Sequence, residues 1–342
     1  MIRTKTTFII GAGASCELAM PANDELLLKV GQSFDFARLG TDTQTRDSVM
    51  LYQYLSKLAT RIGKGEADVQ RAANRLRVAS KLGRSIDTVL DQHDTDPLIA
   101  ACGKLAIVHF LCQAEAKSIL RLTPRVAGDL PIQGTETWLY QFGQLVTSGV
   151  PRSQVEKCLD EVSVVCFNYD RAIEHFLPHA LVMAFGMSLK EAQAIVAAKL
   201  RIYHPYGVIG RLPWQPGETA DVEWGTEQPW NIHNLAAGIR TSGEIMRDHQ
   251  ALMQMRGMVS NAKRLVFLGY GFQPQNIDML IDYGLSHDPE VVATVWGMSQ
   301  TNINSITRML RRKCGMETDE NLVITPQRAN DVMRDYSLLL ES

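Results

Sequence analysis

Four short clusters of polar and small residues contain the side chains of this sequence best suited to chemistry. His204 supplies an imidazole, which titrates near neutral pH and can take a proton from a hydroxyl or a water and return it. Asn168 supplies a neutral donor and acceptor without adding charge, and Asp170 supplies a carboxylate two positions later. The four clusters are Gly11-Ala12-Gly13-Ala14-Ser15, Asn168-Tyr169-Asp170, His204-Pro205-Tyr206-Gly207 and Gly269-Tyr270-Gly271-Phe272.

The first cluster follows an apolar run, Phe8-Ile9-Ile10, which predicts a buried strand and a tight turn into a helix. Its glycines allow the backbone to approach a ligand, and the start of the helix offers N–H groups and a positive dipole end to a phosphate. The dinucleotide fingerprint is incomplete, because Cys16 replaces the third glycine and the region near Asp35 does not resemble a strand end. An ordinary dehydrogenase is therefore disfavoured, and a tight turn without a ligand remains an alternative.

Six apolar segments separated by helical patterns must position these clusters. They are residues 8–10, 162–167, 201–203, 264–268, 290–296 and 321–325. This alternation predicts an α/β fold with a Rossmann-like, doubly wound parallel sheet of about six strands. Ligands bind beyond the carboxyl ends of such strands, and each cluster follows a predicted strand. We therefore expect the four clusters to share one site.

A helical insertion is expected between the first and second strands. Residues 1–40 and 160–342 are predicted to form the core, and residues 41–159 the insertion. Its helical patterns cover residues 49–62, 67–81, 97–119 and 136–147. The basic residues between 67 and 84 favour a solvated helix face over a nucleic-acid or acidic-partner patch.

Two helix starts carry capping signals. Asn23 is expected to cap the helix that continues through residues 26–30. Ser85 begins another capped helix, in which Asp87 either accepts a backbone N–H or serves a ligand.

The composition limits the classes of function. The 342 residues suffice for one large domain with an insertion, and the net charge of −2 gives no general attraction to nucleic acid or an anionic membrane. The six cysteines are scattered without a Cys-x-x-Cys pair, which argues against structural zinc and a disulfide framework. The first strand follows Met1 so closely that we expect no signal peptide, and no apolar run looks long enough to span a bilayer. A cytoplasmic protein is expected.

Three tryptophans, Trp214, Trp224 and Trp230, lie in an irregular segment rich in proline and glycine. They suit a lid or a surface for stacking on a base, and equally a hydrophobic plug over the end of the sheet.

With their order and strand-end placement, the four clusters and Pro21 resemble the sirtuin family, in particular the sirtuin-like domains of bacterial antiphage defence proteins. The resemblance spans about residues 6 to 300. It implies NAD bound in an inverted manner on a Rossmann-like sheet, and cleavage of the bond between nicotinamide and ribose. Asn168 would position the ribose and a water, Asp170 would hold the nicotinamide end or orient the loop, and His204 would be the general base.

The residues expected to bind NAD, with those of the four clusters first, are Gly11, Ala12, Gly13, Ala14, Ser15, Gly207, Gly269, Tyr270, Gly271, Phe272, Pro21, Asp87 and Asn276. Each active-site residue also has a structural interpretation. Asn168 and Asp170 would cap the helix that follows them, His204 would be a hydrogen-bonded core histidine, and Gly269 and Gly271 would only permit a turn.

The sequence departs from the sirtuin deacylases in two ways. The zinc-binding cysteine quartet is absent, and Asn23-Asp24-Glu25 replaces the expected Asp-Phe-Arg segment. Loss of the acyl-lysine groove leaves water as the nucleophile, so the resemblance implies an NAD hydrolase without a metal that depletes NAD in antiphage defence. A homo-oligomer or a regulatory partner such as a HerA-type DNA translocase is implied. The alternatives are a module that binds NAD or ADP-ribose without turnover and, ranked last, a deacylase or ADP-ribosyltransferase.

Overall fold

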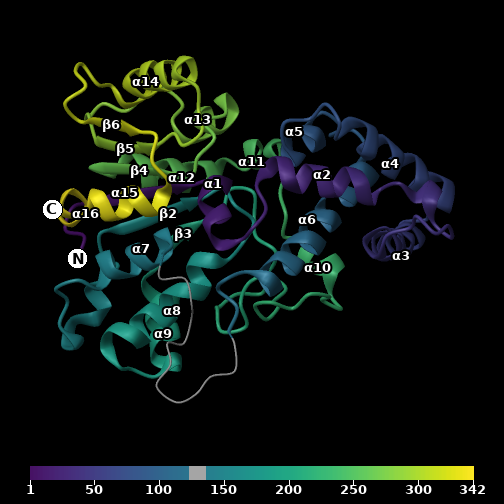
Figure 1. Ribbon diagram of the computed structural model, residues 1–342, viewed down its shortest axis with the longest axis horizontal. Helices are drawn as coiled ribbons and strands as arrows, with labels where there is room; N and C mark the ends of the chain where they lie inside the picture. The colour runs from purple at the N-terminus through teal and green to yellow at the C-terminus, as the bar shows by residue number, and fades with distance from the viewer. Residues whose placement is uncertain (123–135) are drawn as a thin grey trace.

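Six parallel strands form one sheet in the order β3-β2-β1-β4-β5-β6 in the computed structural model (Figure 1), which describes residues 1–122 and 136–342. This is the strand order of dinucleotide-binding Rossmann sheets, and it confirms the predicted fold class. The strands are β1 (Thr6–Ile10), β2 (Val162–Cys166), β3 (Arg201–Tyr203), β4 (Arg264–Leu268), β5 (Glu290–Thr294) and β6 (Leu322–Thr325).

The central strand, β1, is buried on both faces because helices cover both sides of the sheet. Phe8 and Ile10 point to one face, where Phe8 packs edge-on against Phe142 with ring centroids 5.1 Å apart. Ile9 points to the other. The first face is covered by α7 (Trp138–Thr147), α8 (Ala172–Phe185) and α15 (Ala329–Asp335), and the second by α12 (His249–Ser260), α13 (Pro274–Leu280) and α14 (Gln300–Cys314).

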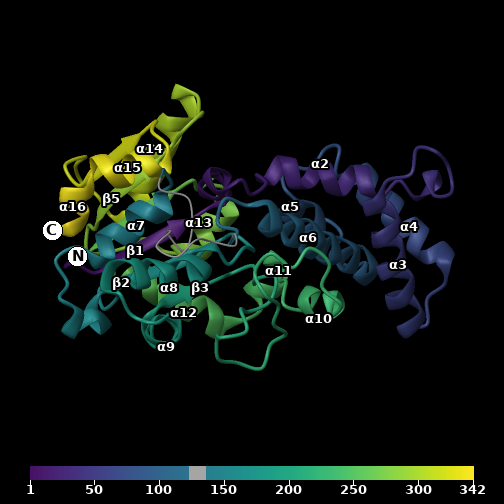
Figure 2. The ribbon, with the colours of Figure 1, turned by 60° about the horizontal axis from the view of Figure 1, so that its bottom comes forward.

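A group of helices projects from one end of the sheet (Figures 1 and 2). It contains α2 (Asn23–Ser33), α3 (Arg46–Arg61), α4 (Glu66–Ala79), α5 (Ile86–Asp91) and α6 (Pro97–Lys117). In this group α2 packs with the helices that follow it, whereas α7 packs on the sheet. The division expected at residues 41 and 159 therefore does not coincide with the packing, and residues 123–135 of the expected insertion lie outside the described residues.

The core helix α6 is long and apolar enough to cross a membrane by length and composition alone. It is not an uninterrupted apolar run, because it contains Lys104 and Glu115. Its most apolar 18-residue window has a mean hydropathy of 1.5, and 72% of that window is buried inside the protein. The helix packs against α2, α3, α4, α5 and α10 (Ile232–Ala236). This is the environment of the central helix of a bundle.

The remaining elements are short connections and covering helices. They are α1 (Ala12–Ser15), α9 (Leu189–Lys199), α11 (Ser242–Met246), α16 (Ser337–Glu341) and the 3-10 helices Cys16–Leu18, Phe36–Arg38 and Arg152–Lys157.

One of the two capping predictions was wrong. Ala22 occupies the N-cap position of α2, no side chain caps that helix, and Asn23 is its first residue. The other was confirmed, because the Ser85 hydroxyl accepts a hydrogen bond of 3.2 Å from the Thr88 N–H.

Candidate functional site

A buried chain of hydrogen bonds joins the ends of β1 and β2. The amide Nδ2 of Asn168 donates to the carbonyl oxygen of Gly11 at 3.1 Å and to the Ser15 hydroxyl at 2.7 Å. That hydroxyl donates to Asp170 Oδ2 at 2.7 Å, and Asp170 Oδ1 accepts from the Ala172 N–H at 3.1 Å. Asp170 thus accepts a hydrogen bond from the first residue of α8, but Arg171 occupies the N-cap position and no side chain caps that helix, so the capping interpretation was wrong for Asp170. Asn168 crosses to the glycine turn instead.

The polar atoms of this chain are not equally occupied. Both N–H groups of the Asn168 amide are used, whereas its Oδ1 makes no hydrogen bond to the described residues. Burial raises the pKa of Asp170, although the hydrogen bonds from Ser15 and Ala172 favour its charged form. The side-chain oxygen Oδ1 of Asn168 is therefore the atom of this hydrogen-bond chain that remains available to a ligand.

The glycines of the first and last clusters allow the two loops to interlock. A Cβ atom on Gly13 would lie 2.9 Å from the Gly269 carbonyl oxygen, and one on Gly11 only 2.5 Å from it. Gly269 has a φ of +58°, and its Cβ would meet the Ala14 nitrogen at 1.9 Å. Close contact between backbones therefore explains these three glycines.

In the same contact, most of the N–H groups that were expected to bind a phosphate donate hydrogen bonds to backbone carbonyl oxygens instead. The amides of Gly11, Gly13 and Ala14 donate to Leu268, Gly269 and Gly11 respectively, at 3.0 Å each. The Ala12 amide makes no hydrogen bond to the described residues. The turn therefore offers one free amide, and not the cradle that was expected.

Two tyrosines add polar contacts from neighbouring elements. Tyr169 donates from its hydroxyl to Asp87, and Tyr206 donates to Asn276 Oδ1 at 2.6 Å. Burial raises the pKa of Asp87 to about 6, partly opposed by the hydrogen bond from Tyr169. A carboxyl group with such a pKa exchanges protons readily near neutral pH.

His204 is enclosed by protein on both sides of its ring. Its Nδ1 lies 2.9 Å from the Asn168 backbone oxygen, and its Nε2 lies 3.0 Å from Glu174 Oε1. Burial favours the neutral imidazole, but the Glu174 carboxylate opposes it and the pKa of His204 is raised well above its usual value. With both nitrogens donating, the ring has no lone pair for a substrate proton, so the geometry opposes the predicted role of general base.

Two cavities meet at this edge of the sheet. The inner cavity, of about 50 Å³, lies at the ends of β1 and β2, and the outer cavity, of about 550 Å³, lies at the ends of β1, β4 and β5. Ala12, Asn23, Tyr270 and Gly271 line both, so the cavities are neighbours across the glycine turn.

Most of the predicted residues line one of these cavities. The inner one is lined by Gly11, Ala12, Ser15, Pro21, Asp87, Asn168, Asp170, Tyr270, Gly271 and Asn276, and the outer one also by Gly13 and Gly269.

Four predicted residues line neither cavity. Ala14 and Phe272 are buried in the core, where Phe272 packs against Phe267 and Tyr270. Gly207, at φ +74°, packs against Gly238, and His204 is enclosed as described. These positions hold the loops in place.

Sequence reasoning assigned no role to several lining residues. Tyr206 lines the inner cavity and Asn23, expected only to cap a helix, lines both. Trp296 and Arg328 line the outer cavity, with the guanidinium carbon 4.8 Å from the ring centroid. Tyr206 and Trp296 both lie near strand ends, and this position could have identified them from the sequence. The pairing of Trp296 with Arg328 could not be identified in this way, because it depends on β5 and β6 being neighbours in the sheet.

The other predicted features lie elsewhere or carry no site. Trp214 and Trp224 line a separate cavity, and Trp230 is 92% exposed. Among residues 1–122 and 136–342, no group of three or more His, Cys, Asp or Glu side chains is placed to hold a metal ion.

No family model matches the sequence, and no curated protein matches it either.

Proposed function

We propose that this protein is an NAD hydrolase that cleaves the bond between nicotinamide and ribose at the carboxyl edge of the sheet. The observation that carries the proposal is the pair of adjoining cavities across the Gly11–Gly13 turn, with Asn168, Asp170 and Asp87 at the inner end. The motif resemblance to sirtuin-like domains supports the same reaction.

The outer cavity suits the adenosine half of a dinucleotide. It has room for a nucleoside, an aromatic ring at Trp296 for stacking, and a cation at Arg328 for a phosphate. This places the nicotinamide half toward Asn168, beyond the turn.

The inner cavity has the groups that departure of nicotinamide requires. Positive charge builds on the ribose as the neutral nicotinamide leaves, so positioning and electrostatics matter more than a strong nucleophile. The free Oδ1 of Asn168 offers a partial negative charge or accepts from a hydroxyl. Asp87, with its raised pKa, replaces His204 as the group that accepts the proton of the attacking water. His204 acts by fixing the backbone of Asn168.

One observation favours a second candidate, a module that binds NAD or ADP-ribose without turnover. The inner cavity of about 50 Å³ holds one or two waters, so a nicotinamide ribose needs the segment containing Pro21 and Asn23 to move outward. A protein that never opens there would bind only the adenosine half.

Product analysis distinguishes the two candidates. The purified chain is incubated with NAD and the mixture is separated by chromatography. A hydrolase gives equal amounts of nicotinamide and ADP-ribose, whereas a binding module leaves NAD intact although titration calorimetry detects its binding. Addition of acylated peptide tests for a deacylase, which would form product only with that acceptor.

The same proposal includes a role as an NAD-depleting effector of antiphage defence, held inactive until it is triggered. An inner cavity of only about 50 Å³ suits such a resting state, because it is too small for the nicotinamide ribose. Control through self-assembly or through a HerA-type translocase predicts a change in mass when active complexes form. A chain that is fully active as a permanent monomer would contradict it.

A further inference from the structure

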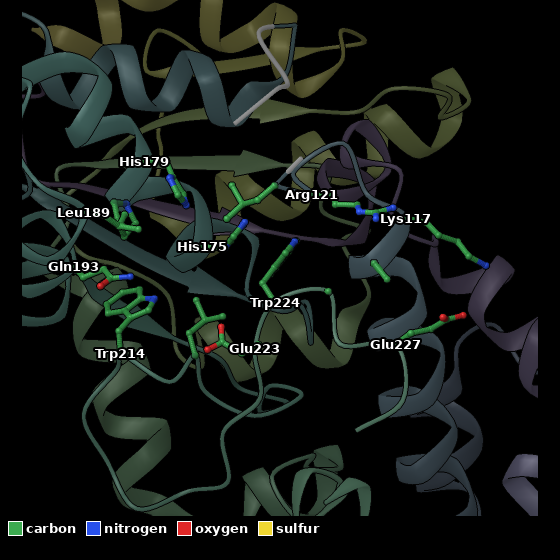
Figure 3. Close-up of a pocket in the computed structure, with 15 residues that line it drawn as sticks. Lys117, Arg121, His175, His179, Leu189, Gln193, Trp214, Glu223, Trp224 and Glu227 are labelled. Atoms are coloured by element: carbon green, nitrogen blue, oxygen red, sulfur yellow. The ribbon is translucent and has the colours of Figure 1, made fainter. Parts of the chain in front are cut away.

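A second large cavity lies away from the candidate site, between α8, α9, the end of α6 and the segment 212–227 (Figure 3). Its volume is about 560 Å³, close to that of the outer cavity. None of the residues that line it lines the inner or outer cavity. We call it the lateral cavity.

Aromatic side chains form one wall of the lateral cavity. The ring of His175 stacks on Trp224 with centroids 4.2 Å apart and planes inclined by 1°. Trp214 also lines the cavity but lies apart from this stacked pair (Figure 3). Burial and the neighbouring His179 lower the pKa of His175 to about 3, so this wall carries an uncharged imidazole. Such a surface suits a flat, uncharged ring.

Polar groups surround this wall (Figure 3). Lys117 and Arg121 line one side of the cavity and form no ion pair with a described acidic residue, while Glu223 and Glu227 are the acidic residues of the lining. The indole N–H of Trp224 is buried and has no hydrogen-bond acceptor among the described residues. A buried donor without an acceptor normally indicates a missing partner.

The segment that carries this wall is fixed by a fully buried ion pair. Arg171 donates to Glu115 at 3.0 and 2.5 Å, and also to the Val222 carbonyl oxygen at 2.6 Å. Its guanidinium carbon lies 5.9 Å from the Trp224 ring centroid. The tryptophan is therefore held in place before any ligand arrives, which lowers the entropic cost of binding.

We propose that the lateral cavity binds a nucleoside 5′-phosphate, with the base against Trp224 and the phosphate at Lys117 and Arg121. The aromatic wall supplies stacking, and the two cations supply charge-assisted hydrogen bonds to the phosphate. Glu223 and Glu227 offer acceptors for ribose hydroxyls. The cavity has the volume for such a ligand. This site is independent of the proposed NAD hydrolysis.

The test is binding of AMP to the purified full chain by titration calorimetry. We expect Trp224→Leu and Arg121→Gln each to weaken AMP binding by about tenfold or more. Matched controls are Trp230→Leu, at a tryptophan that is 92% exposed, and Arg61→Gln on α3, which should bind within about twofold of the original chain. Circular dichroism checks that each variant is folded.

Further arms separate this site from the candidate active site. Trp296→Leu in the outer cavity should leave the lateral AMP binding intact, and inorganic phosphate alone should compete weakly. Unchanged AMP affinity in both Trp224→Leu and Arg121→Gln would overturn the proposal. So would AMP binding that disappears only in Trp296→Leu, or binding that inorganic phosphate displaces and that Trp224→Leu leaves intact.

Discussion

Nδ1 of His204 lies 2.9 Å from the backbone carbonyl oxygen of Asn168. The two residues predicted to share a site are therefore neighbours, but the contact uses the main chain of Asn168 and not its side chain. The Asn168 amide turns the other way, toward Gly11 and Ser15. His204 thus supports the loop from behind, while Asn168 lines the inner cavity.

The His204–Glu174 pair predicts how stability depends on pH. The raised pKa means that the folded state binds a proton which the unfolded state releases near pH 6.5. The pair's contribution to the free energy of unfolding is complete below that pH and is lost as the pH rises through the pKa of His204 in the folded state. Its size is about 1.4 kcal/mol for each unit by which the folded pKa exceeds the unfolded pKa. Urea unfolding between pH 6 and 9 should show stability falling, with a smaller slope for Glu174→Gln. Equal slopes would show that the pair does not hold the proton.

Replacement by alanine is predicted to destabilise the protein strongly at Gly269 and hardly at all at Gly271. Gly269 has a positive φ and no room for a Cβ, so Gly269→Ala should cost at least about 2 kcal/mol in the free energy of unfolding. A Cβ on Gly271 would meet no atom within 4 Å, so Gly271→Ala should change the free energy of unfolding by no more than about 0.5 kcal/mol. Chemical denaturation compares the two. Similar losses would mean that the loops do not interlock as described.

The Glu115–Arg171 pair predicts strong non-additivity. Both side chains are fully buried, so Arg171→Leu alone leaves a buried carboxylate and should cost about 3–5 kcal/mol. The double variant Glu115→Leu with Arg171→Leu should lose less than the sum of the single variants by at least about 1 kcal/mol. Additive losses in thermal or chemical unfolding would contradict this arrangement.

Asp87 predicts the acid side of the pH–rate profile. As the proposed proton acceptor it must be ionised, so NAD hydrolysis should rise as the pH increases through about 6. Asp87→Asn should reduce the rate by about 100-fold or more and remove that rise. The original chain and the variant are compared at saturating NAD. A rise that persists in Asp87→Asn would assign the titration to another group.

The fold could be predicted because the central strands β1 and β4 are buried on both faces and appear as apolar runs. Phe8-Ile9-Ile10 is one example, since its neighbouring residues serve opposite faces of the sheet. Of the site, the sequence could predict only that the loops after the strands meet at one edge of the sheet. Asp87 and Tyr169 are 82 positions apart, and nothing local in the sequence pairs them. The orientation of His204 depends on Glu174, a helical residue whose inward position no motif indicated.

The loss of Asn168 tests the central claim most directly. Nicotinamide release from NAD is measured for the original chain, for Asn168→Ala and for Asn234→Ala, a control at an exposed asparagine on α10. The account predicts that the original chain and Asn234→Ala release nicotinamide at similar rates, and that Asn168→Ala is slower by about 100-fold or more. Equal rates in all three proteins, or no release by the original chain under any condition that activates it, would contradict the account.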